Sequence, residues 1–125
     1  MNALQHAAAA YGDPAPSLRS PRDTEFDAFA RVTRALKASC AASPEAFAAR
    51  ARALSDNRRL WAVLALDLAD DRNTLPDQTR LQLLNLAQFV MNESDRILGG
   101  QGELEVLVDI NSAVMRGLRG EGGTR

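Results

Sequence analysis

The chain has 125 residues, and its hydrophobic and charged fractions of 46% and 25% are those of an ordinary globular protein of one domain. A net charge of −1, from 15 Lys and Arg against 16 Asp and Glu, argues against a nucleic-acid binder that acts through a strong basic field. The single Cys excludes an internal disulfide, and one Cys with one His excludes a zinc finger built from these two residue types.

The sequence gives no sign of a membrane span or an export signal. Its longest strongly apolar run, Leu60 to Leu66, is about a third of the ~20 residues that a spanning helix needs. No basic residue precedes the apolar residues near the N-terminus, so this stretch is a poor signal peptide. We therefore expect a cytoplasmic protein that does not insert into a membrane.

Residues 1–19 are expected to form an arm. Gly, Pro and Ser residues break regular structure over 12–21, and the Ala-rich stretch before them is so short that a helix there is marginal on its own. Ser20-Pro21 is typical of a helix start, with Ser20 as the N-cap. The first main helix is predicted over about 21–42, from an amphipathic stripe of Phe26, Phe29, Leu36 and Cys40.

A second helix is predicted over about 44–70. Ser43-Pro44-Glu45 repeats the start signal, and an apolar residue recurs every seven positions at Phe47, Leu54, Trp61 and Leu68. Ser55-Asp56-Asn57 are weak helix formers, but the apolar phase is kept across them. We therefore expect one long helix with room for a bend at these residues.

The third and fourth helices are predicted over about 76–98 and 102–118, separated by Gly99-Gly100. Apolar residues cover more than half of the circumference of the third helix, and we expect such a helix at the centre of the fold. Gly117 should weaken the last turn of the fourth helix, and residues 120–125 should form a disordered tail. Because no stretch alternates with period two, the sequence predicts one all-α domain of four main helices over 20–119.

No catalytic, cofactor or metal site stands out, so we expect a protein that is not an enzyme. Cys40 and His6 form a nucleophile pair only if the arm is ordered over the first helix, and a buried structural Cys is the ordinary interpretation. Asp67, Asp70 and Asp71 share a helix face at a spacing that a hard cation can use. Solvated charges, capping bonds or neighbouring Arg partners explain the three acids more simply.

Two polar residues interrupt apolar stripes. Asp67 falls among leucines, and Asn111 lies on the apolar face of the last helix. A buried polar group without a hydrogen-bond partner costs about 1–3 kcal/mol. Each of the two side chains should therefore either be paired within the fold or contact a partner protein in an apolar groove. Trp61, the only Trp, has the same two interpretations, core packing and partner contact.

Three short motifs follow one another through the middle of the chain: Asn57-Arg58-Arg59-Leu60-Trp61, Asp67-Leu68 and Asn73-Thr74-Leu75-Pro76. Two more stand nearer the C-terminal end, Asp109-Ile110-Asn111 and Gly117-Leu118. In this order and spacing the motifs resemble the signature of the FlaF family of flagellar biosynthesis regulators. The resemblance covers roughly residues 11–118.

The resemblance implies a small cytoplasmic flagellum-biogenesis protein that binds flagellin as a secretion chaperone and regulates its synthesis and export. It also implies FlbT as a partner regulator, and we expect a monomer or weak dimer. Terminal segments of flagellin form amphipathic helices, which an apolar groove can cover by helix-in-groove docking. Partner contacts are expected at residues that match the family motifs, with the polar ones fixing the register of the docked helix: Trp61, Asp67, Asn73, Leu75, Asp109 and Asn111.

A helix-turn-helix regulator of flagellar gene expression is the alternative function. It needs a recognition helix with basic residues on its exposed face, for which the candidates are Arg50, Arg52, Arg58 and Arg59. Neighbouring acids dilute this basic group and the net charge is negative, so we do not expect nucleic-acid binding. An α-helical enzyme is a third interpretation, which no acid–base pair supports.

Overall fold

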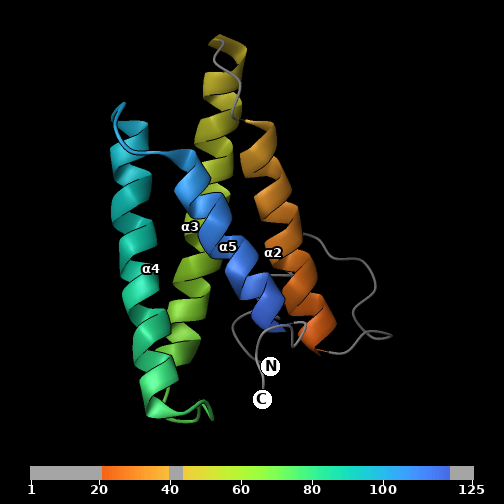
Figure 1. Ribbon diagram of the computed structural model, residues 1–125, viewed down its shortest axis with the longest axis vertical. Coiled ribbons are helices and arrows are strands. Elements are labelled where there is room, and N and C mark those ends of the chain that lie inside the picture. The colour runs from red at the N-terminus through yellow and green to blue at the C-terminus, as the bar shows by residue number, and fades with distance from the viewer. Residues whose placement is uncertain (1–20, 40–43, 119–125) are drawn as a thin grey trace.

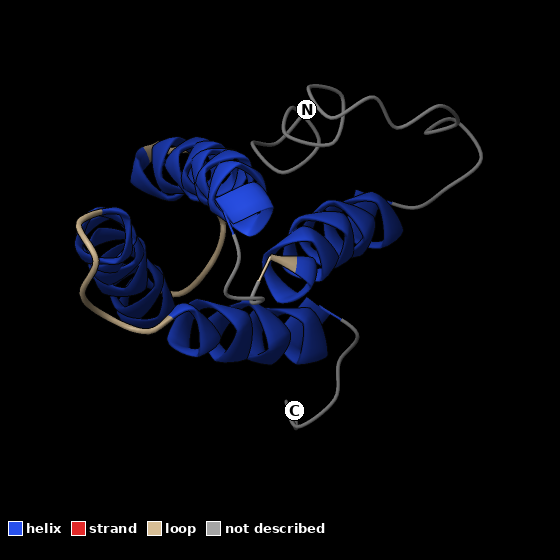
Figure 2. Cartoon of the chain, turned by 90° about the horizontal axis from the view of Figure 1, so that it is seen from above, coloured by secondary structure: helices blue, strands red, loops and turns tan. Residues whose placement is uncertain are grey.

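The computed structural model describes residues 21–39 and 44–118, and these form four helices (Figure 1). The helices are α2 (Pro21–Ala38), α3 (Pro44–Ala69), α4 (Asp77–Leu98) and α5 (Leu104–Leu118). The predicted all-α class is confirmed, and the view from above in Figure 2 shows no strand in the described ranges. The expected arm over 1–19 and tail over 120–125 lie outside the described residues.

The helix ends follow from local residues, as two examples show. α2 ends at Ala38, earlier than predicted, because the amide and hydroxyl of Ser39 both donate to the carbonyl oxygen of Leu36, at 3.1 and 2.8 Å. α4 ends in a Schellman motif, in which Gly100 has φ +89° and the amide of Gln101 donates to the carbonyl oxygen of Arg96 at 2.8 Å.

α3 runs without interruption through Ser55-Asp56-Asn57, as the unbroken apolar phase predicts. It has 26 residues, yet neither it nor any other helix within the described ranges has the length and apolar content to cross a membrane.

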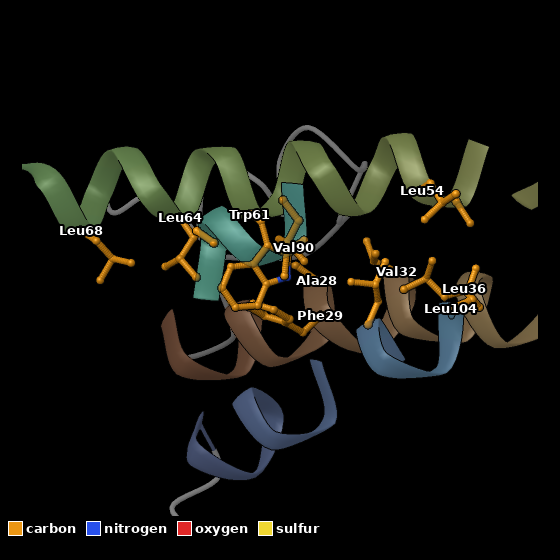
Figure 3. Close-up of a cluster of buried hydrophobic side chains, with 14 residues drawn as sticks. Ala28, Phe29, Val32, Leu36, Leu54, Trp61, Leu64, Leu68, Val90 and Leu104 are labelled. Carbon is orange, nitrogen blue, oxygen red and sulfur yellow. The ribbon is translucent and has the colours of Figure 1, made fainter. Parts of the chain in front are cut away.

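The core lies where all four helices meet, around the apolar stripe of α3. Leu54, Trp61 and Leu68 are fully buried, and the Trp61 ring meets that of Phe29 edge to face, with centroids 5.8 Å apart (Figure 3). Phe47 begins the same stripe in sequence but is 56% exposed. The reason is that the first turns of α3 extend beyond the neighbouring helices in Figure 1.

α2 and α3, and not α4, are the inner helices, because each of them packs on two neighbours. α3 packs against both α2 and α4, whereas α4 packs mainly on α3 and α5 mainly on α2. The prediction that the helix over 76–98 is central is therefore wrong. α4 lies at an edge, and its wide apolar surface is only partly covered, with Leu81 61% and Phe89 42% exposed.

Candidate functional site

An open, mainly apolar groove of about 650 Å³ lies between α4 and α5. One side comes from α4 and the turn before it, and the other side comes from the second half of α5. Among the residues that line the groove, only Thr79 and Asp109 have polar side chains. The residues that line this α4–α5 groove are Leu75, Thr79, Leu83, Leu86, Asp109, Ile110, Ala113, Val114 and Gly117.

The groove exists because its two sides are held by different neighbours. α4 rests on α3, and α5 crosses over to rest on α2, so the two helices make few contacts with each other. Near the open end, Nε of Arg80 donates to the carbonyl oxygen of Leu68 at 3.0 Å, which ties the first turn of α4 to the end of α3. The first turns of α4 and the last turns of α5 therefore stay apart.

At the opposite end α4 and α5 are joined by a tight turn that a buried carboxylate secures. Glu93 of α4 is 4% exposed; its Oε2 accepts from the backbone amide of Glu103 at 3.0 Å, and its Oε1 accepts from Nη1 of Arg96 at 2.8 Å. Gly102 has φ +78°, and a Cβ added there would lie 2.7 Å from Oε2 of Glu93. The turn therefore needs glycine at this position for both backbone conformation and space.

A polar cluster of Thr33, Asn57, Trp61 and Asn111 fixes α5 to α2 and α3 in the core. Oδ1 of Asn111 accepts from Nε1 of Trp61 at 2.9 Å, and its Nδ2 donates to Oδ1 of Asn57 at 2.8 Å and Oγ1 of Thr33 at 3.2 Å. Nδ2 of Asn57 is buried without a hydrogen-bond partner in the described part of the chain. Asn111 is thus the hub of the cluster.

The six residues predicted to contact a partner fall into three groups. Trp61 and Asn111 are both 0% exposed and belong to the polar cluster, so they hold the helices that form the groove and present no side-chain surface at it. For Asn111 this arrangement matches the interpretation in which the residue bridges helices. For Trp61 it matches core packing.

Asp67 and Asn73 form the second group, at the turn after α3. Nδ2 of Asn73 donates to the carbonyl oxygen and to Oδ2 of Asp67, at 3.2 and 3.3 Å, and its Oδ1 accepts from the amide of Leu75 at 3.0 Å. These contacts match the interpretation in which Asp67 caps the turn, and they place Leu75 at the mouth of the groove. A contact of Asp67 or Asn73 with a partner stays a prediction.

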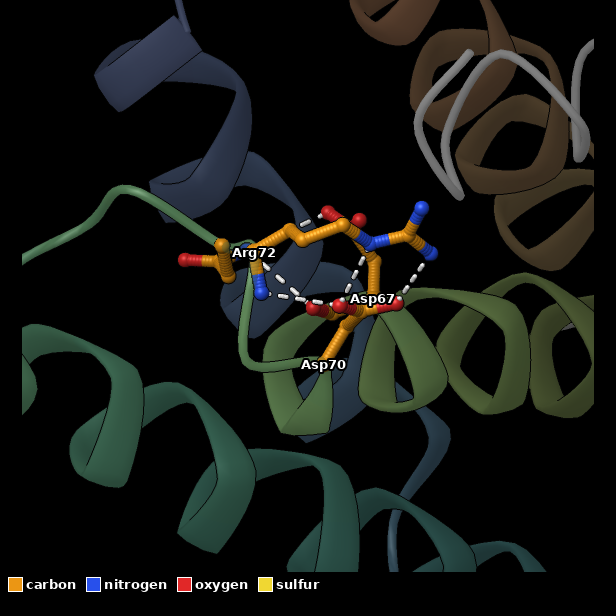
Figure 4. A network of polar contacts seen from close by, with 4 residues as sticks. Asp67, Asp70 and Arg72 are labelled. Atoms are coloured by element: carbon orange, nitrogen blue, oxygen red, sulfur yellow. Dashed lines mark hydrogen bonds and ion pairs between the residues drawn. The ribbon is translucent and has the colours of Figure 1, made fainter.

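The neighbouring acid Asp70 is held by a cation rather than left free for a metal. Its carboxylate accepts from the backbone amide and the guanidinium of Arg72, at 2.8 to 3.0 Å (Figure 4). These bonds keep the pKa of the Asp70 carboxyl well below its usual range. In the described ranges no group of three or more His, Cys, Asp or Glu residues is arranged to hold a metal ion.

Leu75 and Asp109, the third group, both line the groove. Leu75 is 40% exposed and Asp109 is exposed at the rim. The sequence interpretation missed the rest of the lining, most clearly Leu83 and Leu86 on α4 and Ala113 on α5. The available signal was the wide apolar surface of α4, which exceeds what one neighbour can cover.

Three of the four arginines considered for nucleic-acid recognition, Arg50, Arg58 and Arg59, interact with other residues of the chain. Nη1 of Arg58 contacts Oδ1 of Asp95 at 2.8 Å. The guanidinium of Arg50 lies over the ring of Phe47, 5.9 Å from its centroid, and Nη1 donates to the carbonyl oxygen of Ser39 at 3.4 Å. This arrangement gives the helix-turn-helix alternative no support.

Comparison with known proteins identifies one family. The family model described as flagellar protein FlaF matches residues 7–118, which includes every helix of the structure and the whole groove. No curated protein and no solved structure matches the chain.

Proposed function

The chain belongs to the flagellar protein FlaF family, and from this premise we propose that it binds flagellin in the cytoplasm as a secretion chaperone and so regulates flagellin synthesis and export. In this proposal the protein acts by binding and not by catalysis. Its partner is a terminal segment of flagellin that forms an amphipathic helix.

The open α4–α5 groove is the observation that carries the proposal. Leu75, Leu83 and Leu86 face Ile110 and Val114 across it, so an apolar surface lies between two helices with no element of the described chain over it. Contiguous apolar surface of this kind usually marks an interaction site. An amphipathic helix that polymerises when free is the kind of partner that such a surface can cover.

The chemistry of the lining favours a protein helix over a small polar ligand. Small-molecule sites combine apolar surface with several convergent polar groups that fix orientation. Here the only lining side chains with polar atoms are Thr79 and Asp109. Recognition therefore depends mainly on apolar contact, which suits the apolar face of a helix.

Calorimetric titration of the full-length chain with monomeric flagellin from the same bacterium tests the proposal. The wild-type chain should bind flagellin and should delay filament growth measured by light scattering. Ala113→Glu places a carboxylate at an exposed position of the groove and should weaken binding about tenfold or more.

Ala62→Glu is the matched control, because Ala62 is an exposed α3 residue outside the groove lining. This variant should bind flagellin as the wild-type chain does. A wild-type chain that neither binds flagellin nor delays its polymerisation contradicts the proposed function.

A further inference from the structure

Gly117 has no role in the fold that explains its missing side chain. It lies in the last turn of α5, where glycine is a poor helix former compared with alanine. Among the described glycines only Gly100 and Gly102 have positive φ, and a Cβ added at Gly117 would meet nothing within 4 Å. Neither backbone conformation nor internal packing therefore requires glycine at this position.

Gly117 and Ala113 form a strip of small residues on the α5 side of the groove, beside the larger Ile110 and Val114. They are four positions apart on α5, so they lie on the same helix face, and both are exposed to the groove. The opposite side carries the large apolar side chains of Leu75, Leu83 and Leu86. The distance between packed helices depends on the side chains at their contact, so a foreign helix that lies over Ala113 and Gly117 can approach the backbone of α5 closely.

Building on the proposed function, we propose that the groove receives one α-helix of flagellin that lies along α5, with its backbone against Ala113 and Gly117. Its apolar side chains, spaced three, four and seven positions apart, point toward the leucines of the α4 side. The groove follows α5 from Asp109 to Gly117, about 12 Å of helix axis or roughly two turns. Gly117 is thus a specificity-determining residue whose missing side chain makes room for the partner.

Asp109 gives the docked helix its direction. It is the only charged residue of the lining, it is exposed, and its side chain makes no hydrogen bond or ion pair with the described residues. A carboxylate in this position attracts a Lys or Arg beside the apolar stripe of the partner. Apolar contact alone leaves direction undefined, whereas a charge at one end of the groove favours one orientation.

A larger side chain at position 117 tests whether the flagellin helix closely approaches α5. Gly117→Leu in the full-length chain should weaken the affinity for monomeric flagellin about tenfold or more in calorimetric titration. Its melting temperature should stay equal to that of the wild-type chain or rise, because the position is open and leucine is the better helix former. Ala62→Leu adds the same apolar bulk at an exposed position of α3 and should bind as the wild-type chain does.

A second variant, at Asp109, tests whether the charge of this carboxylate contributes to flagellin binding. Asp109→Asn keeps the shape of the side chain and should weaken flagellin binding about threefold to tenfold at low salt. Since salt screens exposed charges, the affinity of this variant should depend less on NaCl concentration than that of the wild-type chain. An unchanged salt dependence overturns the assignment of a basic residue opposite Asp109.

The outcomes separate this inference from the proposed function. Flagellin that binds the wild-type chain and Gly117→Leu equally well overturns the inference and leaves the proposed function intact. A wild-type chain that does not bind flagellin overturns both. If the chain without flagellin sediments as a dimer that Gly117→Leu converts to a monomer, a second copy occupies the groove and the inference is wrong.

Discussion

Replacing Asn111 with Leu should destabilise the fold far more than replacing Asn57 with Leu, although both side chains are fully buried in the same polar cluster. The two residues differ in the number of groups that depend on them. Asn111 pairs with Trp61, Asn57 and Thr33, whereas Asn57 pairs only with Asn111 and already leaves its Nδ2 without a partner in the described chain.

The contacts give the expected magnitudes. Asn111→Leu leaves Nε1 of Trp61 and Oδ1 of Asn57 buried without partners, at about 1–3 kcal/mol each. Burial of the leucine returns about 1.5–3 kcal/mol, so the net loss is roughly 2 kcal/mol. Asn57→Leu removes one hydrogen bond together with the unpaired amide, and Asn111 keeps Thr33 as an acceptor. Its net effect should stay within about 1 kcal/mol of zero.

Urea unfolding followed by the fluorescence of Trp61, the single tryptophan, and by far-UV circular dichroism measures both variants. Asn111→Leu should lower the midpoint with the slope unchanged, and Asn57→Leu should unfold close to the wild-type midpoint. If Asn57→Leu is the more destabilised of the two, Asn111 is not the hub of the cluster. If Asn111→Leu unfolds at the wild-type midpoint but no longer binds flagellin, Asn111 instead lies at the interface with flagellin.

Two further predictions concern the turns at either end of α4. Gly102→Ala should destabilise the chain more than Gly100→Ala, as compared by urea midpoints. Both substitutions force alanine into a positive φ, at about 1–2 kcal/mol, but only at Gly102 does the new Cβ also displace the carboxylate of Glu93 from its hydrogen bond. The pKa of Asp70 is depressed in the folded state by hydrogen bonds from Arg72, so the stabilisation it provides is fully present above the ordinary carboxyl pKa of about 4 and is lost as the pH falls below it. In acid titrations followed by circular dichroism, Asp70→Asn should therefore lose stability less steeply below pH ~4 than the wild-type chain, and equal slopes would contradict this coupling.

The candidate site was only partly predictable. Leu75 and Asp109 were identified through the family motifs, and both line the groove. Trp61 and Asn111 belong to the same motifs but are buried, because a motif does not state which side of a helix its neighbours will cover. The sequence marks Gly117 as a weak point of the last helix turn and as part of the Gly117-Leu118 motif, but it assigns this glycine no contact. Its meaning depends on the empty space beside it, which is a property of the assembled fold.

The helices could be predicted from local signals, since each signal acts over a few residues. The seven-residue spacing keeps α3 continuous through Asn57, and Gly99-Gly100 ends α4 in a Schellman motif. Which helices lie inside the fold, and where apolar surface stays open, depends on contacts between distant parts of the chain. Periodicity shows how much of α4 is apolar but not whether a second helix covers it, and Asn111 meets Trp61 across 50 positions of sequence that no local pattern relates. The groove arises because α5 packs on α2 while α4 packs on α3, a choice made by long-range contacts in the core.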